Sequence, residues 1–503
     1  MRLKRFVCLF LAVLMLTSGA ALAEETGKTS YIMAGLDSTQ YRDWLNNQFF
    51  VRMEEKTGVK FVYQQYTKAE EWTKAKAAMS KGNKNLPDVL FKAALTGDEC
   101  IALREKGVLI DLKPYLQENC PNLWAILEEH PDYLEAITLP DGSVAALPFI
   151  TPTPSQNYMW INREWLNTLR LDAPATAQEL VDVLTAFKTR DPNRNGKADE
   201  IPMGFLGPFD LKFLAHAFGL IANDYNIFVD DGQVKFMPLE NNFRLFVTWC
   251  RDLYAEGLLD KNGFTLTDPM RTVTDSKATA TYGMILTNMA ADIFKVSWSS
   301  NYEIMMPLAY EGNQVYRSFA GPVLRGTFAI TSKCPEPEKM LQWVDFLYTQ
   351  EGAILAGIGQ ENVDYLVDGD GTWRLLDSNQ QNYDIYRAGT LIEGGTENPG
   401  VLAGDFQKKI SGGDAVVAIL DKQEQFNEFV RLPFPYYTLT KEQEEKIGPL
   451  QSEIGCYVDM QIARWVLGEE EISDASFAAF EQKLNELGIQ DFLTFWQGIL
   501  DAR

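Results

Sequence analysis

Histidine is nearly absent from this chain, which has only His130 and His216 among its 503 residues. Neither histidine lies near a serine or cysteine in a nucleophile motif, so the base–nucleophile pair of a hydrolase is not indicated. Aspartate and glutamate are abundant, and a carboxylate pair of the glycosidase kind stays open, but no local motif marks one. We therefore expect a protein that is not an enzyme.

Cysteine is also scarce, and its spacing is irregular. One of the six cysteines falls within the apolar N-terminal run, and none forms a C-x-x-C pair, so neither a zinc site nor a disulfide framework is indicated. Cys100 and Cys120 remain a potential pair, while buried free thiols are the expected state. The five cysteines beyond the N-terminal run are Cys100, Cys120, Cys250, Cys334 and Cys456.

Basic residues are outnumbered by acidic ones. The chain has 46 Lys and Arg against 69 Asp and Glu, which gives a formal net charge of −23 at pH 7. Nucleic acids and anionic membrane surfaces repel such a chain, so neither is expected as a partner. A polyanionic ligand is disfavoured for the same reason unless a local basic cleft receives it.

Long apolar runs are missing except at the N-terminus. Arg2, Lys4 and Arg5 precede the run at 6–16, which is too short to span a bilayer, and 21–23 reads Ala-Leu-Ala. This is the pattern of a secretory signal peptide over residues 1–23, cleaved near Ala23. No cysteine for lipidation follows the small residues, so we expect an exported protein that is held at the cell surface through a partner.

The remaining 480 or so residues have a globular composition and are enough for two or more domains. Strand patterns at 29–33, 59–63 and 86–91 alternate with helical patterns at 41–57 and 72–81. This rhythm predicts an α/β fold with a largely parallel sheet.

Later segments suggest two lobes. The prolines at 151–154 suit a crossover, the stretch 176–188 predicts a helix that Thr176 caps with Glu179, and 325–330 reads as a buried strand. From 442 onward the pattern is helical to the end, with large apolar side chains at helical spacing.

The segment 191–200 spaces oxygen ligands as a calcium loop does. Side-chain oxygens alternate, Gly196 stands where such a loop turns sharply, and a backbone carbonyl follows. An EF-hand would carry Glu at the twelfth position, which is Pro202 here, so we expect a free-standing structural Ca²⁺ loop and not a paired sensor. The alternative is an Asx-rich turn without an ion. The predicted ligands are Asp191, Asn193, Asn195, Lys197 (through its carbonyl), Asp199 and Glu200.

Several short motifs occur along the chain in a specific order and spacing. They are E-K-T-G-V at 55–59, L-P-D-V-L at 86–90, G-V-L-I-D-L at 107–112, D-G-S-V-A-A-L-P at 141–148, W-I-N-R-E-W-L at 160–166, A-I-T-S at 329–332 and W-V-D-F-L-Y at 343–348. Together these motifs resemble the extracellular solute-binding proteins of ABC importers, in the subgroup of oligosaccharide and alginate binders. The likeness extends over essentially the whole mature chain, and larger members of that subgroup carry a calcium loop in the same place.

The resemblance implies a two-lobed, periplasmic-binding-protein-like α/β fold with hinge segments and a helical C-terminal cap. We expect an N-terminal lobe of 24–150 plus about 297–325 and a C-terminal lobe of 151–296 plus about 327–440 with the calcium loop. The segment 441–503 would pack on the lobes. Many members are lipoproteins, and the missing lipidation cysteine departs from that pattern.

A sugar has an apolar ring face and a rim of hydroxyls, so its binder needs aromatic platforms and planar polar groups. Residues of these types cluster near the expected hinges, and the two arginines would also pair with a carboxylate if the ligand were acidic. The candidates are Phe149, Gln156, Asn157, Tyr158, Trp160, Trp298, Tyr302, Arg317 and Arg325.

We therefore expect a monomeric binding protein that captures a carbohydrate, an oligosaccharide above all, by lobe closure and delivers it to an ABC permease. The alternatives that remain open are a sensory binding protein that signals to a membrane kinase, a peptide binder of the same fold, and a secreted carbohydrate-active enzyme. Sequence alone does not separate them.

Overall fold

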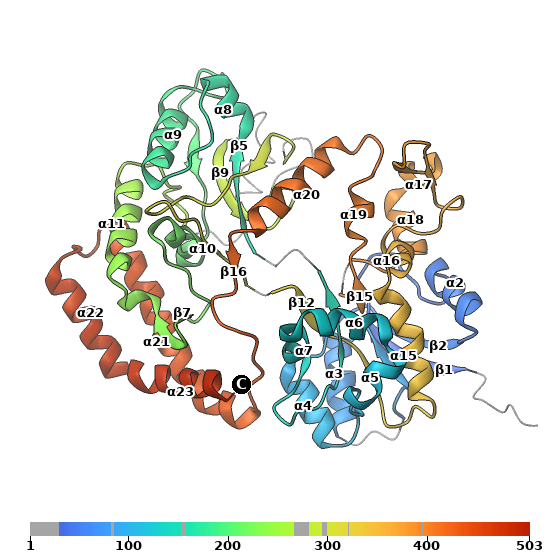
Figure 1. Cartoon of the computed structure of the whole chain (residues 1–503). Helices are drawn as coiled ribbons and strands as arrows, with labels where there is room; N and C mark the ends of the chain where they lie inside the picture. The colour runs from blue at the N-terminus through green and yellow to red at the C-terminus, as the bar shows by residue number, and fades with distance from the viewer. Residues whose placement is uncertain are drawn as a thin grey trace, which may run out of the picture.

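The computed structural model describes residues 30–81, 85–151, 156–265, 281–293, 299–319, 321–394 and 396–502. These form two lobes, with the N-terminal lobe on the right of Figure 1 and the C-terminal lobe on the left. The chain passes to the C-terminal lobe after strand β4, returns before β12, and passes over again after helix α19. The predicted signal peptide lies outside the described residues.

A six-stranded sheet organises the N-terminal lobe in the order β15-β4-β12-β3-β1-β2. Only β12 runs antiparallel to its neighbours, so the carboxyl ends of the other five strands meet at one edge. Apolar side chains cover both faces of the sheet, as a parallel sheet requires. The strands are β1 (Tyr31–Leu36), β2 (Phe61–Tyr66), β3 (Val89–Phe91), β4 (Leu147–Ile150), β12 (Val323–Ile330) and β15 (Gly400–Val401), with a separate hairpin of β13 (Tyr365–Val367) and β14 (Trp373–Leu375).

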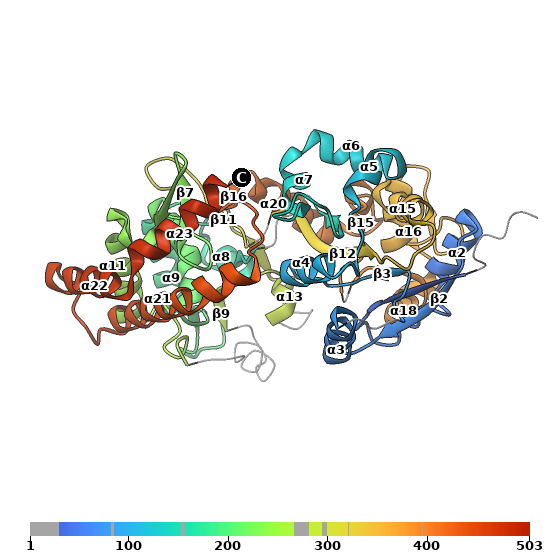
Figure 2. The ribbon, with the colours of Figure 1, turned by 90° about the horizontal axis from the view of Figure 1, so that it is seen from below.

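Helices enclose this sheet, with α3 and α4 over one face (Figure 2). The helices of the lobe are α2 (Gln48–Thr57), α3 (Ala69–Ser80), α4 (Gly97–Glu105), α5 (Lys113–Asn119), α6 (Pro121–Glu129), α7 (Pro131–Ile137), α15 (Pro337–Asp345), the 3₁₀ helix η3 (Phe346–Tyr348), α16 (Gln350–Gly357), α17 (Asp377–Gln381), α18 (Tyr383–Thr390) and α19 (Gly404–Gln407).

Strand β12 has a bulge that only glycine permits. Gly326 has a φ of +76°, and a Cβ there would lie 2.1 Å from the carbonyl oxygen of Leu95. The register against β4 shifts at this point. The bulge brings β12 and the loop after β3 into close contact at the edge that faces the other lobe.

The C-terminal lobe has a mixed four-stranded sheet in the order β10-β5-β9-β6 and a single large apolar core. Its strands are β5 (Tyr158–Asn162), β6 (Ile201–Met203), β9 (Tyr282–Thr287) and β10 (Tyr302–Ile304), with the pairs β7 (Ile227–Asp230) and β8 (Gln233–Phe236), and β11 (Tyr316–Arg317) and β16 (Val430–Arg431). Its helices are α8 (Arg163–Leu169), α9 (Ala177–Thr189), α10 (Gly207–Phe213), η1 (Leu214–Phe218), η2 (Met237–Leu239), α11 (Asn241–Ala255), α13 (Ala290–Ile293), α20 (Asp414–Asn427), α21 (Lys441–Leu467), α22 (Asp474–Leu487) and α23 (Ile489–Asp501).

The helical C-terminal segment is confirmed, and it packs into the core of the C-terminal lobe. Trp465, Phe480 and Trp496 are all buried there, and α21 lies against α11. Gly468 and Gly488 end α21 and α22 in the left-handed conformation. This segment therefore completes one lobe and is not an appendage.

The structure corrects the expected lobe boundaries. Residues 297–325 were expected in the N-terminal lobe, yet β10 pairs with β5 and β11 with β16, both in the C-terminal lobe. Residues 327–440 were expected in the C-terminal lobe, yet β12 lies between β3 and β4, and the helices through α19 follow it. Periodicity identifies strands, but it does not identify their partners.

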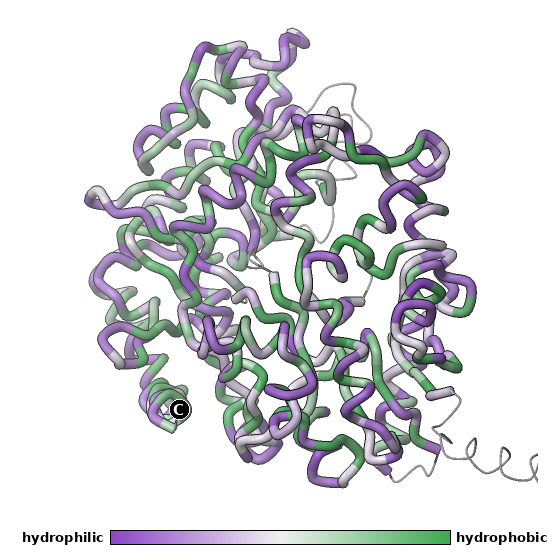
Figure 3. The backbone as a smooth tube through the Cα atoms, turned by 45° about the vertical axis from the view of Figure 1, so that its right-hand side comes forward, coloured by the Kyte–Doolittle hydropathy of each residue, from purple (hydrophilic) through white to green (hydrophobic). Residues whose placement is uncertain are grey.

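Hydrophobic and hydrophilic stretches alternate along the chain in both lobes (Figure 3). Within the described part of the chain, every helix is too short or too polar to cross a bilayer. Among the described cysteines none is bonded to another: Cys100, Cys120 and Cys250 are buried thiols, Cys334 is half-buried and Cys456 is exposed. Cys100 and Cys120 therefore do not form the potential pair.

Candidate functional site

Three of the predicted ligand residues meet where the chain crosses between the lobes. Gln156 is buried and its Nε2 donates to Oδ1 of Asn427 at 3.1 Å, which lies 3.5 Å from the hydroxyl of Tyr158. The carbonyl of Asn157 accepts from the hydroxyl of Tyr316 at 2.8 Å. These contacts therefore hold the crossover segment in place. The side chain of Tyr158 is also fully buried.

Arg317 has a similar structural role. Its side chain is 2% exposed and donates to Asp224, and its guanidinium lies 4.3 Å from the ring centre of Phe213. Burial lowers the pKa of Arg317, and Asp224 opposes that shift. Arg317 thus fixes the position of the Asp224 carboxylate. The side chain of Asp224 is 55% exposed, so its carboxylate remains open to solvent.

Asp224 lies at a hollow of about 310 Å³ between the lobes. The C-terminal lobe supplies one wall, the start of β12 with Val323 and Arg325 supplies the other, and the segment that leads to α21 runs between them. Volumes of this size are typical of small-molecule sites. The lining residues are Asn223, Asp224, Tyr225, Phe319, Val323, Arg325, Leu432, Phe434, Pro435, Tyr436 and Tyr437.

Aromatic rings in the walls are held by their neighbours. Tyr225 stacks on Trp496 with ring centres 5.5 Å apart, and Tyr437 meets the same ring edge-on at 4.8 Å. Trp496 is fully buried in the core of the C-terminal lobe. Rings fixed in this way present apolar surface without a further loss of rotamer freedom.

Arg325 stands on the opposite wall from Asp224. Its Nη1 donates to the carbonyl oxygen of Tyr437 and to Oγ1 of Thr438, both at 2.9 Å. Because Arg325 belongs to β12 and Tyr437 packs against Trp496, this contact links the lobes. The hollow therefore combines a carboxylate acceptor, a guanidinium donor and aromatic walls, a set suited to a ligand rich in hydroxyl groups.

The other predicted ligand residues lie elsewhere. Trp160 and Tyr302 line a separate cavity of about 440 Å³ beneath α20, although each side chain is at most 4% exposed. Phe149 is buried in β4 within the N-terminal sheet. Trp298 lies outside the described residues. The structure thus does not gather all nine candidates into one site.

A buried ionic cluster occupies the carboxyl edge of the N-terminal sheet. Asp37 follows β1 and Lys92 follows β3, so parallel strands bring them together, and Nζ of Lys92 lies 3.3 Å from Oδ2 of Asp37. Arg42 joins the cluster at 3.2 Å, and all three side chains are fully buried. Burial opposes the ionisation of Asp37, yet Lys92 and Arg42 hold its pKa below the ordinary value.

The two cations of this cluster bind a remote segment. Lys92 donates to the carbonyls of Ile392 and Gly394 at 2.6 and 2.9 Å, and Arg42 donates to that of Glu393 at 2.9 Å. The carboxyl oxygen Oε1 of Glu393 is itself buried without a partner. Burial, reinforced by Glu397, raises the pKa of Glu393 to about 7.

The predicted calcium loop joins α9 to β6. Its backbone turns through left-handed conformations at Asp191, Arg194 and Gly196. Both carboxylate oxygens of Asp191 accept backbone N–H groups, from Asn195 at 3.1 Å and from Gly196 at 3.0 Å. The loop is therefore closed on itself by Asx turns, as the prediction requires and as an ion-free turn would also allow.

The donor set of the loop fits a hard cation. Oε1 of Glu200 is buried without a partner, and burial raises the pKa of Glu200 with added repulsion from Asp191 and Asp199. Oδ1 of Asp199 accepts from Nδ2 of Asn195 at 2.9 Å. Among the described residues no three His, Cys, Asp or Glu side chains are grouped tightly enough to bind a metal, so amide and carbonyl oxygens would have to complete the set.

Sequence reasoning missed most of the interlobe hollow. Asp224 and Tyr225 follow a stretch without any motif, and their positions depend on remote partners, Arg317 for Asp224 and Trp496 for Tyr225. The run Leu-Pro-Phe-Pro-Tyr-Tyr at 432–437 is a further signal, because its two prolines indicate a loop and three of its six residues are aromatic.

Comparison with known proteins decides the family. Residues 48–358 match the family model described as bacterial extracellular solute-binding protein. The chain belongs to this family. Its sequence is 27% identical over 508 residues to the fructooligosaccharide ABC transporter substrate-binding protein FusA of Streptococcus pneumoniae serotype 4 (strain ATCC BAA-334 / TIGR4), with 96% of this chain and 92% of FusA covered.

Solved structures of the family agree with the fold. FusA in complex with kestose has a TM-score of 0.68 at 25% identity, with 94% of this chain and 99% of that one covered. An HMO-binding solute-binding protein from Bifidobacterium longum infantis ATCC 15697 has a TM-score of 0.75 at 21% identity, covering 95% and 99%. Alginate-binding AlgQ2 without calcium ion has a TM-score of 0.64 at 22% identity, covering 94% and 98%, and a further FusA structure is of an EF-hand mutant.

Proposed function

We propose that this protein is the substrate-binding protein of an ABC importer and that it captures an oligosaccharide between its two lobes. The observation that carries the proposal is the likeness to FusA over 96% of the chain, together with an interlobe hollow of matching chemistry. Capture makes and breaks no bond. Ligand would bind the closed form more tightly than the open one, and an ABC permease would receive the closed form.

The hollow supports a neutral, hydroxylated ligand. Asp224 is fixed by Arg317 and accepts hydrogen bonds from hydroxyl groups, while Arg325 donates from the other lobe. Tyr225 and Tyr437 offer ring surface to the apolar face of a sugar. One ligand that satisfies groups on both lobes favours the closed arrangement.

Titration calorimetry of the mature chain with kestose and a panel of neutral and acidic oligosaccharides tests the proposal. We expect saturable binding of one neutral class and recovery of the glycan intact. Asp224→Asn should weaken that binding about tenfold or more, because a hydrogen bond to a charged group contributes roughly 1.5–3 kcal/mol. Asp172→Asn, an exposed change in the same lobe, is the matched control.

Each contrary result has a definite meaning. Cleavage of the glycan would establish an enzyme and contradict the proposal. Binding of peptides with no binding of any glycan would keep the family and overturn the ligand class. Equal affinities for Asp224→Asn and wild type would remove the hollow from the account.

We also propose that 191–200 binds a structural Ca²⁺. Support comes from the all-oxygen donor set, the buried and unpartnered Oε1 of Glu200, and a FusA relative for which an EF-hand mutant exists. The ion would neutralise a carboxylate, Glu200, whose pKa is raised by burial and further by repulsion from Asp191 and Asp199. The loop lies between α9 and β6, apart from the interlobe hollow, so the ion would act on stability and not on the ligand.

A further inference from the structure

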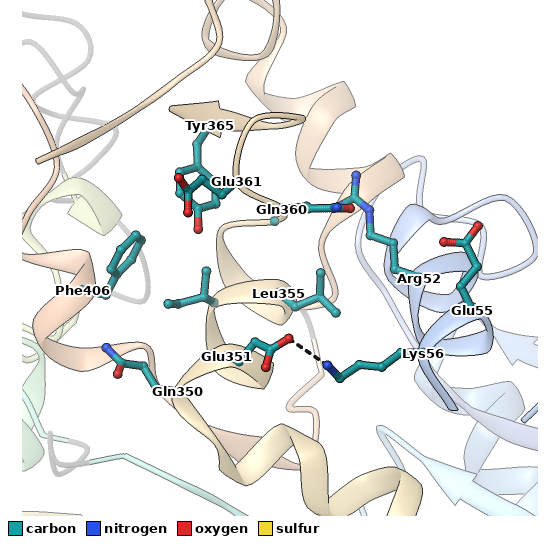
Figure 4. A pocket seen from close by; sticks show the side chains of 12 residues that line it. Arg52, Glu55, Lys56, Gln350, Glu351, Leu355, Gln360, Glu361, Tyr365 and Phe406 are labelled. Atoms are coloured by element: carbon teal, nitrogen blue, oxygen red, sulfur yellow. Dashed lines mark hydrogen bonds and ion pairs between the residues drawn. The ribbon is translucent and has the colours of Figure 1, made fainter. Parts of the chain in front are cut away.

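A cavity of about 730 Å³ lies in the N-terminal lobe, and none of its lining residues comes from the other lobe. Helices α2 and α16 and the turn before β13 enclose it, and α19 closes one side (Figure 4). Its floor is apolar and its rim is polar. The lining residues are Arg52, Glu55, Lys56, Gln350, Glu351, Ile354, Leu355, Gly359, Gln360, Glu361, Tyr365 and Phe406.

Two aromatic rings form a corner of this cavity. Phe406 lies parallel to Trp373, at 2° between planes and 5.8 Å between centres, and Nε1 of Trp373 donates to the Phe406 carbonyl at 2.7 Å. Tyr365 meets Phe406 at 67° and 5.7 Å. Because Trp373 supports one side of Phe406, the ring is a fixed platform for the cavity, which Figure 4 shows beside Tyr365 and above Gln350.

The cations of the rim are already paired. Arg52 forms an ion pair with Asp364, and Nζ of Lys56 lies 2.8 Å from Oε1 of Glu351 (Figure 4). Glu55 and Glu361 add two more carboxylates to the lining. An anionic ligand would be repelled here, whereas a neutral one would find acceptors and donors in carboxylates and amides.

The backbone beneath the rim is fixed as well. Oδ2 of Asp364 accepts the N–H of Gln360 at 2.8 Å while it binds Arg52, so the turn that carries Gln360 and Glu361 is attached to α2. Gln360 and Gln350 are exposed and lie at opposite sides of the floor (Figure 4). An aromatic platform, planar amides and a preset turn are the elements of a sugar subsite.

We propose that this cavity is a second glycan site, which binds one or two neutral sugar units independently of the interlobe hollow. That the occupant is a sugar rests on the proposed function, because the same glycan would reach both sites. The ring of Phe406 would stack on the apolar face of the sugar, and Gln350, Gln360 and Glu361 would bind its hydroxyl groups. The site would be occupied whether the lobes are open or closed.

Kestose is the probe for the test, with the full mature chain and calcium present throughout. We expect calorimetry to resolve two sites, the second of roughly millimolar affinity because it is open to solvent, and soaked crystals to show density beside Phe406. Gln360→Ala should weaken the second site about tenfold, and Phe406→Ala should abolish it. Neither should change the interlobe site. Gln360 is exposed, so its replacement leaves folding intact even if Phe406→Ala does not.

Tyr383→Ala is the matched control, since this exposed aromatic of the same lobe does not line the cavity. A single site in wild type, or a second site unaffected by Gln360→Ala and Phe406→Ala, would overturn the second site and leave the proposed function intact. Weakening of the tight site in Asp224→Asn with the weak one unchanged would support two separate sites.

Discussion

The inner faces of the two lobes are built from different interactions. The N-terminal lobe places the buried charges of Asp37, Arg42 and Lys92 at the carboxyl edge of its sheet. The C-terminal lobe has the buried cation Arg317 in the short strand β11, with phenylalanine rings beside it and a half-exposed partner in Asp224. The charges of the N-terminal lobe hold the segment 392–394 in place, whereas the pair in the C-terminal lobe presents the Asp224 carboxylate to the interlobe hollow.

The difference shows where stability and binding are separable. Charges fully withdrawn from water must be matched closely, so changes in the N-terminal cluster should act on folding. Asp224 keeps solvent contact and lines the hollow, so its loss should act on ligand binding as well as on the buried guanidinium of Arg317. Three substitutions and the removal of calcium test this difference between the lobes, in order of decreasing effect on stability.

Asp37→Asn should have the largest effect on folding. It removes the carboxylate that contacts both Lys92 and Arg42, and breaking a buried pair in this way costs about 3–5 kcal/mol. Thermal unfolding measures the loss, and Asp172→Asn is the exposed control. Equal melting temperatures for the two variants would show that the cluster does not stabilise the N-terminal lobe.

Removal of calcium should have the next largest effect, and it should act on the C-terminal lobe. An ion present at a hundred times its Kd contributes about 2.7 kcal/mol through linkage. Chelation should lower the melting temperature, calcium should restore it, and Asp191→Asn should be insensitive to both. Because the pKa of Glu200 is raised, protons compete with the ion and the calcium-dependent increment should shrink as the pH falls. A melting temperature unchanged by chelation would show that no bound ion stabilises the loop.

Glu393→Gln should be stabilising at pH 8. The pKa of Glu393 is about 7 in the folded protein against 4.5 ordinarily, so the fold binds its proton more tightly than the unfolded chain does. Stability from this group is fully present below pH 4.5 and is lost as the pH rises to about 7. The variant should therefore gain on the order of 1–3 kcal/mol at pH 8 and almost nothing at pH 4.5. A gain that does not vary with pH would contradict this reading.

Glu351→Gln should change stability least. The pair of Lys56 and Glu351 has side chains that are 42% and 72% exposed, and exposed pairs contribute at most about 1 kcal/mol. Thermal unfolding in low and high salt measures it. A loss as large as that of Asp37→Asn would erase the distinction between buried and exposed charges on which the comparison rests.

Local features of the fold were predictable from the sequence, whereas partners were not. Thr176 caps α9 as predicted, because its Oγ1 accepts the backbone N–H of Glu179. The Glu179 carboxylate accepts the backbone N–H of Ala175 instead of that of Thr176, so the predicted capping box is not completed. The strand at 325–330 is confirmed within β12. Its assignment to a lobe needed long-range pairing, which periodicity does not encode.

The site shows the same limit. Residue types near the hinges pointed to Arg317 and Arg325, and both lie at the interlobe region. The sequence could not show that Arg317 is buried and forms an ion pair with Asp224, because that depends on the three phenylalanine rings that pack around its guanidinium. Calcium binding by the loop at 191–200 remains a prediction, which rests on the spacing of its oxygen ligands.

Capture by lobe closure is the central claim, and a distance between the lobes tests it most directly. Spin labels at Val62→Cys in β2 and Leu245→Cys in α11, both exposed positions, report that distance once Cys334 and Cys456 are replaced by serine. We expect a shorter and narrower distance distribution at saturating kestose than without it, and a much smaller change for Asp224→Asn than for wild type at a kestose concentration near the wild-type Kd. Stoichiometric binding of kestose with an unchanged distance distribution would contradict it.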